Sequence, residues 1–264
     1  DEYYIEIDYN KINVLTDHTN KYYRDIEGIV VNPPSTSVMN AFYDSKYYLE
    51  NDVHVMLIFV DGLSYNQYEY LCEHYPQLFL SNIEGVQKAT SVFKPVTNAG
   101  FAAMITGAPP VENGIYNRDY REVQTDTIFD IAESSLLIEG DIKILNTHSE
   151  LILNADQSGD GYTDDEVYLS ALEHIDDGHD FMLVHFHGID DAGHDFGPFG
   201  DQTIHRIETI DGYISELVSM WDGQVIIVAD HGMHETAEGG DHGAFRSEDM
   251  LIPYVILSGG KYEK

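Results

Sequence analysis

The chain has 264 residues, 43% of them hydrophobic, and its 13 lysines and arginines face 47 aspartates and glutamates, for a net charge of −34. This composition indicates a folded globular protein. The acidity excludes a nucleic-acid polymer as a partner, because such binding relies on basic side chains. The sequence contains no apolar run long enough for a transmembrane segment. Because Cys72 is the single cysteine, no intramolecular disulfide can form. One cysteine fits both an exported and a cytoplasmic protein, and the high acidity favours an exported one.

Residues 1–50 are rich in tyrosine and only weakly periodic, so we expect an irregular segment that packs on the rest of the chain. The first strong strand is predicted at Val53–Val60, an unbroken apolar run typical of a strand buried on both faces. It ends at Asp61-Gly62. A helix is expected over Tyr65–His74 and a further strand over Val86–Phe93.

Thr97 lies where a turn meets the next predicted helix. That helix is expected over Ala99–Ile105, because Gly107 and two prolines follow it, and Thr97 would therefore sit at its amino end. Beyond it, we expect a helix over Thr127–Glu139 and a short strand over Asp141–Leu145.

The second half of the chain alternates regularly between helix and strand patterns. The expected elements are a helix at Asp164–Ile175, a strand at Phe181–His187, an amphipathic helix at Gln202–Met220, and strands at Gln224–Ala229 and Leu251–Leu257. Such alternation predicts an α/β fold with a mostly parallel central sheet, helices on both faces and a small cap or none. We expect residues 1–264 to form a single domain.

Three of the predicted strands run into acidic or histidine residues at their carboxyl ends. These residues are Asp61, Asp190, His194, Asp230, His231 and His242. In a parallel sheet the carboxyl ends lie along one edge, so these side chains can meet although they are far apart in sequence. Together with the Thr97 hydroxyl they suffice for two divalent metal ions, and such oxygen and nitrogen ligands suit zinc and also manganese.

A pair of metal ions beside a threonine would support phosphoryl chemistry. Two metals can stabilise the attacking and the leaving oxygen of an in-line displacement, and coordination would activate the Thr97 hydroxyl as a nucleophile. The amino end of the helix that follows would supply amide donors for phosphoryl oxygens. Asn98 could bind an oxygen on which charge develops.

Five phrases of the sequence carry a family resemblance. They are VDG at Val60–Gly62, TNAGFAAMITGAPPVENGI at Thr97–Ile115, GIDDAGHDFGP at Gly188–Pro198, ADHG at Ala229–Gly232 and GGDHG at Gly239–Gly243. In this order they resemble the alkaline phosphatase superfamily, in its nucleotide pyrophosphatase/phosphodiesterase branch. Thr97-Asn98 and the TG-x-PP run that follows are similar to phosphonoacetate hydrolases.

The resemblance implies a role for each matching residue. Asp190, His194 and His242 would hold one zinc ion. Asp61, Asp230 and His231 would hold the other, together with the nucleophile Thr97, and Asn98 would be an oxyanion donor. One departure is Gly100, at a position where many of these phosphodiesterases have an asparagine, and it leaves the substrate class open.

The expected function is therefore that of a metal-dependent hydrolase that cleaves phosphate diester, pyrophosphate or phosphonate bonds in a small substrate. One alternative is a phosphoryl-transferring relative, either a phosphomutase or a phospho-group transferase. Another is a non-catalytic metal-binding relic of the same fold. We expect His185 and His187 to serve in packing or hydrogen bonding, and Arg118 and Arg121 to be exposed.

Overall fold

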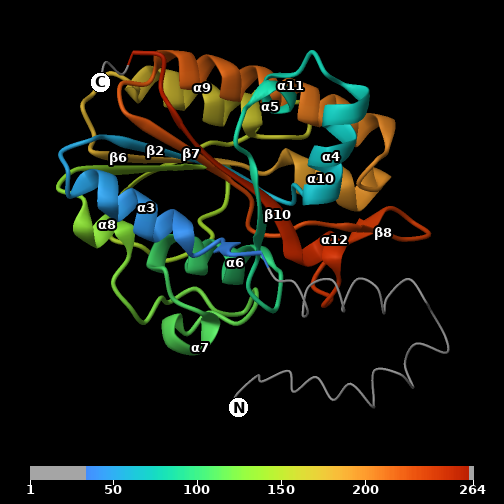
Figure 1. Cartoon of the computed structure of the whole chain (residues 1–264), viewed down its shortest axis with the longest axis horizontal. Helices are drawn as coiled ribbons and strands as arrows, with labels where there is room; N and C mark the ends of the chain where they lie inside the picture. Colours follow the sequence, from blue (N-terminus) through green and yellow to red (C-terminus); the bar gives the residue numbers. More distant parts are fainter. Residues whose placement is uncertain (1–33, 262–264) are drawn as a thin grey trace.

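The computed structural model describes residues 34–261, whose centre is an eight-stranded sheet (Figure 1). In spatial order the strands are β1 (Thr36–Ser37), β3 (Gln87–Thr90), β10 (Leu251–Ser258), β7 (Gln224–Val228), β2 (Val55–Val60), β6 (Phe181–Phe186), β4 (Ser135–Glu139) and β5 (Glu150–Leu153). Strand β10 is antiparallel to both of its neighbours, whereas the other neighbouring strands pair in parallel. The prediction of a mostly parallel sheet is confirmed.

Helices cover both faces of this sheet. Figure 1 shows α3 (Asn40–Leu49) and α6 (Thr97–Thr106) on one side, and α9 (Asp164–His174) and α11 (Asp201–Met220) on the other. The other helices are α4 (Tyr65–His74), α5 (Phe79–Asn82), α7 (Pro110–Asn113), α8 (Ile128–Ile131), α10 (Gly188–Phe196) and α12 (Ser247–Met250). Across residues 34–261, no helix combines the length and the apolar character that a membrane span requires.

The three central strands form the middle of the hydrophobic core. Every residue of β2, β6 and β7 is buried, which explains why their sequences are apolar runs without alternation. Parallel pairing places Val60 opposite Phe186, and Phe59 opposite Val228, so the three strands end side by side. The segments that follow them therefore leave the same edge of the sheet.

Two expectations about secondary structure are wrong. The helix expected over 127–139 is limited to the four residues of α8, and the chain then forms β4, because Leu136, Leu137 and Ile138 are buried beside β6. Residues 141–145 form no strand. The irregular segment expected over 1–50 lies partly outside the described residues. Its described part contains β1 and the ten-residue helix α3, which packs against β2 and α6.

A small hairpin of β8 (His234–Glu235) and β9 (Gly240–Asp241) projects beyond the end of β7. It packs against α10, which follows β6. The hairpin thus returns the chain after β7 to the carboxyl edge of the sheet, and it ends immediately before His242.

Candidate metal centre

The carboxyl ends of β2, β6 and β7 bring three aspartates into one buried cluster. Asp61 is the residue after β2, Asp190 lies in the first turn of α10 after β6, and Asp230 lies two residues after β7. Their relative exposures are 0%, 2% and 0%, so none of the three carboxylates is hydrated by bulk solvent. Buried carboxylates need a compensating partner, because desolvation of an isolated charge is costly.

One group of ligands consists of Asp61, Asp230 and His231. The Nε2 atom of His231 lies 3.4 Å from Oδ1 of Asp61 and 3.2 Å from Oδ2 of Asp230. One ligand atom from each of the three residues lies within 4.8 Å of the others, which is compact enough for a single ion. The structure therefore brings together the three residues that the sequence assigned to one metal.

The second group of ligands is built around Asp190. Its two carboxylate oxygens face different imidazoles: Oδ2 lies 3.3 Å from Nε2 of His194, and Oδ1 lies 3.7 Å from Nε2 of His242. The ligand atoms that lie within 4.8 Å of one another here are those of Asp190, His242 and His231. The structure therefore groups His231 with Asp190 and His242, whereas His194, the third residue of the predicted trio, contacts only the other oxygen of Asp190 in this set of distances.

The three histidines present the same ring nitrogen to the centre. In each, the Nδ1 atom lies within hydrogen-bond distance of a backbone carbonyl oxygen. The distance is 3.0 Å from His231 to Gly232, 3.1 Å from His194 to Gly240 and 2.9 Å from His242 to Pro95. An Nδ1–H that donates to a carbonyl leaves Nε2 with its lone pair, which is the form that binds a metal. The backbone thus sets the ligand tautomer before any ion is present.

The donor set fits divalent metal ions. Several of the buried atoms without a hydrogen-bond partner lie here: Oδ1 of Asp61, Oδ1 of Asp190 and Oδ2 of Asp230. Buried polar atoms in native proteins are nearly always paired, so three unpaired carboxylate oxygens at one place call for an explanation. Mixed carboxylate and imidazole donors suit zinc, and also manganese.

Burial also shapes the charges of this centre. It raises the pKa of Asp61 to about 8, an effect that the positive charge of His187 opposes and the negative charge of Asp190 reinforces. Burial likewise holds the pKa of Asp230 well above its ordinary value and that of His231 well below it. Asp190 is different: burial opposes its ionisation, but its hydrogen bond with His194 and the neighbouring imidazoles keep its pKa below the usual range. Burial thus favours the neutral forms of Asp61, Asp230 and His231, and a nearby positive charge would favour the ionised carboxylates.

Thr97 is the first residue of α6 and lies beside these ligands. It is 4% exposed, and its Oγ1 atom is 3.4 Å from Nε2 of His231. The amides of the first turn of a helix have no intrahelical acceptor, so this end of α6 offers donors to an anion. The predicted placement of Thr97 at a helix amino end is confirmed.

The side chain of Asn98 points away from a role as an oxyanion donor. Its Nδ2 atom donates to the carbonyl oxygen of Tyr120 at 3.0 Å and approaches that of Ile144 at 3.5 Å. These contacts fix the loop around residue 120 beside the helix. Its backbone amide, at the second position of α6, remains the group that could serve the predicted role.

Two glycines allow the backbone to approach the aspartates. Gly62 has a φ of +76°, and a Cβ atom there would lie 2.9 Å from Cα of Asp190. At Gly100 a Cβ atom would lie 2.6 Å from the carbonyl oxygen of Asp230 and 2.7 Å from its Cβ. A side chain at position 100 would therefore displace Asp230.

Substitution Gly100→Ala is expected to push Asp230 out of position and to weaken metal binding by about 10- to 100-fold, the usual effect of disturbing the groups that orient a ligand. Affinity would be measured by competition with a chromogenic chelator. Gly212→Ala is the matched control, because nothing lies within 4 Å of a Cβ atom at that helical position. Equal affinities of the two variants would contradict the prediction.

Three further residues lie near the centre. His185 and His187 each place Nε2 3.2 Å from Oδ2 of Asp61, and for His185 this contact is a hydrogen bond, one of the two roles expected for these histidines. Arg118 is exposed, as expected, and its Nη2 atom lies 2.9 Å from Nε2 of His242, a contact that was not predicted. The one available signal was the spacing of the two histidines, since residues two apart on a strand share a face.

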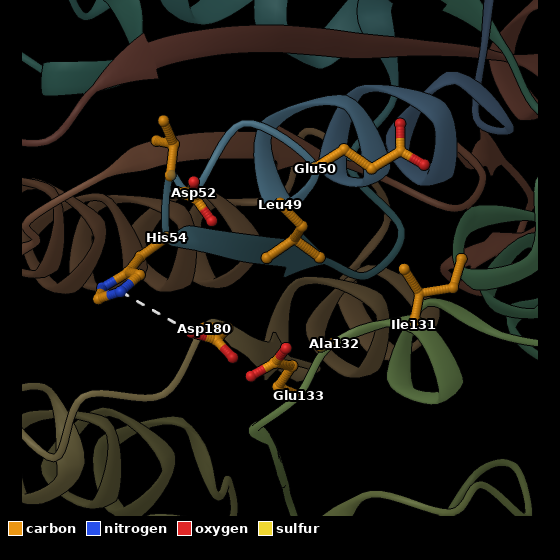
Figure 2. A pocket seen from close by; sticks show the side chains of 9 residues that line it. Leu49, Glu50, Asp52, His54, Ile131, Ala132, Glu133 and Asp180 are labelled. Carbon is orange, nitrogen blue, oxygen red and sulfur yellow. Dashed lines mark ion pairs between the residues drawn. The ribbon is translucent and has the colours of Figure 1, made fainter.

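The opposite edge of the sheet has a different character. Figure 2 shows a cavity of about 350 Å³ there, lined by residues that include Leu49, His54, Glu133 and Asp180. His54 and Asp180 precede β2 and β6, and their side chains form an ion pair at 3.8 Å. Within residues 34–261, the groups of side chains that could hold a metal ion lie at the carboxyl ends of the strands and not at this edge.

Comparison with known proteins supports the resemblance drawn from the motifs. The family model for type I phosphodiesterase / nucleotide pyrophosphatase matches residues 144–253. Human GPI ethanolamine phosphate transferase 1 is 33% identical over 87 residues, a match that spans 30% of this chain and only 9% of the human protein.

Two solved structures share the fold. A phosphonoacetate hydrolase from Sinorhizobium meliloti is 18% identical with a TM-score of 0.54, over 69% of this chain and 56% of that one. Murine ectonucleotide pyrophosphatase / phosphodiesterase 5 is 18% identical with a TM-score of 0.51, over 70% and 59%. This chain thus spans little more than half of the solved structures that it matches. The predicted resemblance to the alkaline phosphatase superfamily and the predicted α/β fold are confirmed.

Proposed function

We propose that this chain, which resembles the nucleotide pyrophosphatase/phosphodiesterase branch of the alkaline phosphatase superfamily, is a two-metal hydrolase of phosphate diester, pyrophosphate or phosphonate bonds. Asp61, Asp230 and His231 would hold one divalent ion, and Asp190, His194 and His242 the other. Zinc suits these donors best, with manganese as the alternative. The substrate would be a small phosphorylated or phosphonate compound.

The observation that carries this proposal is the position of Thr97. A buried hydroxyl at the amino end of a ten-residue helix lies 3.4 Å from an imidazole nitrogen that also contacts Asp61 and Asp230. Val96 occupies the capping position, so the Thr97 hydroxyl does not cap the helix and lies against the imidazole of His231 instead.

In the proposed reaction Thr97 attacks phosphorus. The bond between Oγ and phosphorus forms as the bond from phosphorus to the leaving group breaks, and the hydroxyl proton is transferred in net terms to the leaving group. Water then cleaves the threonyl phosphate, which restores the hydroxyl and releases the phosphoryl product. When bound, the metals would supply positive charge that lowers the pKa of the hydroxyl and neutralises the phosphoryl oxygens.

Other groups of this chain would position the phosphoryl group. The first amides of α6, including that of Asn98, precede the first backbone hydrogen bond of the helix, from Gly100 to Val96, and suit an anionic oxygen. Arg118 is a second candidate, because its guanidinium group already reaches His242 across 124 residues of sequence. In a chain with 13 basic residues, a guanidinium at this place is a notable source of positive charge.

A phospho-group transferase is the second candidate function. The observation in its favour is the match to a human protein named an ethanolamine phosphate transferase, in which a phosphoryl-bearing group passes to an acceptor. The same attack by Thr97 would begin either reaction, and the second step would then use an alcohol in place of water. A non-catalytic relic is disfavoured because all seven predicted metal-binding positions retain suitable side chains.

The proposal predicts metal-dependent turnover of p-nitrophenyl substrates. Protein stripped with a chelator and reloaded with zinc or manganese would be assayed against a phosphate monoester, a phosphate diester and a phosphonate ester. We expect nitrophenol release from at least one of them, only after metal is restored. Release that rises only when an acceptor alcohol is added would favour the transferase. No release with either metal from any of these substrates would contradict the hydrolase.

A further inference from the structure

Asp249 lies at the base of the segment 231–244, which carries two of the candidate ligands, His231 and His242. It is 0% exposed and belongs to α12, the four-residue helix between this segment and β10. We propose that Asp249 is a positioning residue, which holds the segment so that its imidazoles meet the metal pair. This inference rests on the metal pair of the proposed function, but on no step of its reaction.

Both carboxylate oxygens of Asp249 are bound to this segment, one on each side of the hairpin. Oδ1 lies 2.7 Å from Nδ1 of His234, the first residue of β8. Oδ2 accepts a hydrogen bond of 2.8 Å from the backbone amide of Ala244, two residues after His242. One buried carboxylate thus joins the two arms of the chain that lead into and out of the hairpin.

The main chain of α12 holds the neighbour of the other ligand. The carbonyl oxygen of Asp249 accepts a hydrogen bond of 2.8 Å from the amide of Gly232, and the carbonyl oxygen of Gly232 lies 3.0 Å from Nδ1 of His231. A Cβ atom on Gly232 would lie 2.1 Å from the carbonyl oxygen of Glu248, so the two segments are in direct contact there. The peptide that orients the ring of His231 is therefore fixed to the same short helix.

The hairpin extends this restraint to His242 and His194. His234 pairs with Asp241 across β8 and β9, and Oδ1 of Asp241 accepts a hydrogen bond of 2.8 Å from the amide of His242. Gly240, also in β9, has the carbonyl oxygen that lies 3.1 Å from Nδ1 of His194. A displaced hairpin would therefore move groups that orient ligands of both proposed ions.

A carboxylate is the side chain that suits the position of Asp249. The imidazole of His234 and the amide of Ala244 approach different oxygens, and a carboxylate accepts hydrogen bonds at both. Asparagine has one acceptor oxygen, and its other terminal atom is itself a donor. Loss of the groups that orient a metal ligand from outside typically weakens metal binding by about 10- to 100-fold.

The test is the zinc affinity of the protein, measured by competition with a chromogenic chelator. We expect Asp249→Ala to bind zinc about 10- to 100-fold more weakly than the wild type. Asp211→Ala is the matched control, because Asp211 is also buried and accepts hydrogen bonds of 2.8 Å from the amides of Phe79 and Leu80. It lies in α11, which supplies none of the candidate ligands. We expect this control to lose stability and to keep the zinc affinity of the wild type.

Asp249→Asn keeps one acceptor and tests whether the carboxylate itself matters. Its zinc affinity is expected to fall between those of Asp249→Ala and the wild type, and it decides the question if Asp249→Ala does not fold. Wild-type affinity in Asp249→Asn together with wild-type affinity, or no folded protein, in Asp249→Ala would overturn the proposal. An equal loss of affinity in Asp211→Ala would also overturn it, because lost stability alone would then explain the effect.

The same measurements separate this role from the proposed hydrolase. Zinc binding that depends on Asp249, without turnover of any substrate, would support the positioning role and contradict the hydrolase. Wild-type protein that binds no zinc would overturn both the metal pair and the role of Asp249.

Discussion

Replacing Thr97 by alanine is expected to abolish turnover, by about 10³-fold or more, while the zinc content stays that of the wild type. The substitution removes the hydroxyl oxygen of this chain that would form a bond to phosphorus in the first step of the proposed reaction. It leaves in place the six aspartates and histidines that hold the metal pair. Thr97 is 4% exposed and forms no side-chain cap of α6, so we expect little change in the stability of the fold.

Thr97→Ser is the matched control for this prediction. Serine keeps a hydroxyl at the same position and is expected to retain measurable activity, because the amides of α6 and the contact with His231 would remain. Rates would be measured with the nitrophenyl substrate that the wild type cleaves best, alongside elemental analysis of each variant. Turnover of Thr97→Ala at the wild-type rate would remove Thr97 from the mechanism.

Sequence patterns predicted the metal centre because its ligands follow strand ends. Asp61, Asp190 and Asp230 each come soon after an apolar run, and in a parallel sheet such runs end at the same edge. The same patterns failed at β4, where the run Leu136–Ile138 was short enough to be absorbed into a predicted helix. The periodicity of a short apolar run does not distinguish a helix from a strand. Here the position between β6 and β5 makes the run a strand.

The contacts of His185 and His187 could not be predicted, because they depend on register. Parallel pairing of β2 and β6 places Phe59 opposite His185, and this pairing brings the imidazole onto the carboxylate of Asp61 two residues further along β2. A shift of one residue would turn both histidines to the other face of the sheet. Arg118 is a similar case, since its contact with His242 spans 124 residues and involves a loop rather than a regular element.

Metal-free protein is expected to lose stability as the pH rises from 7 to 9. Two of the groups with a raised pKa lose their protons in this interval. Burial raises the pKa of Asp61 to about 8 from a reference of 3.8, and the hydrogen bond with Asp190 raises that of His194 to about 9 from 6.5. Both pKa values are higher in the folded protein than in the unfolded chain.

The sign follows from proton uptake. Above pH 7 the unfolded chain has already lost both protons, whereas the folded protein still holds them in part, so unfolding releases protons and becomes more favourable as the pH rises. Histidines whose pKa is lowered, such as His231 and His242, affect stability only below about pH 6.5 and do not offset this. For a group that keeps its proton in the folded protein and has lost it in the unfolded chain, the free energy of unfolding falls by about 1.4 kcal/mol per pH unit. The contribution of His194 to this fall is smaller, because its side chain is 33% exposed and its interaction with Asp190 is screened by solvent.

Divalent metal is expected to remove this pH dependence, because ligands must lose their protons to bind it. Thermal unfolding would be followed at pH 7, 8 and 9 in zinc and in a chelator. The melting temperature in chelator should fall by about 3–6 °C per pH unit, and the difference between the two conditions should widen accordingly. Asp61→Asn cannot ionise at this position, so its metal-free form should show a smaller slope. A metal-free melting temperature that stays level or rises between pH 7 and 9 would show that the buried carboxylate of Asp61 does not retain its proton, and that the cluster is stable as an ionised centre without its cations.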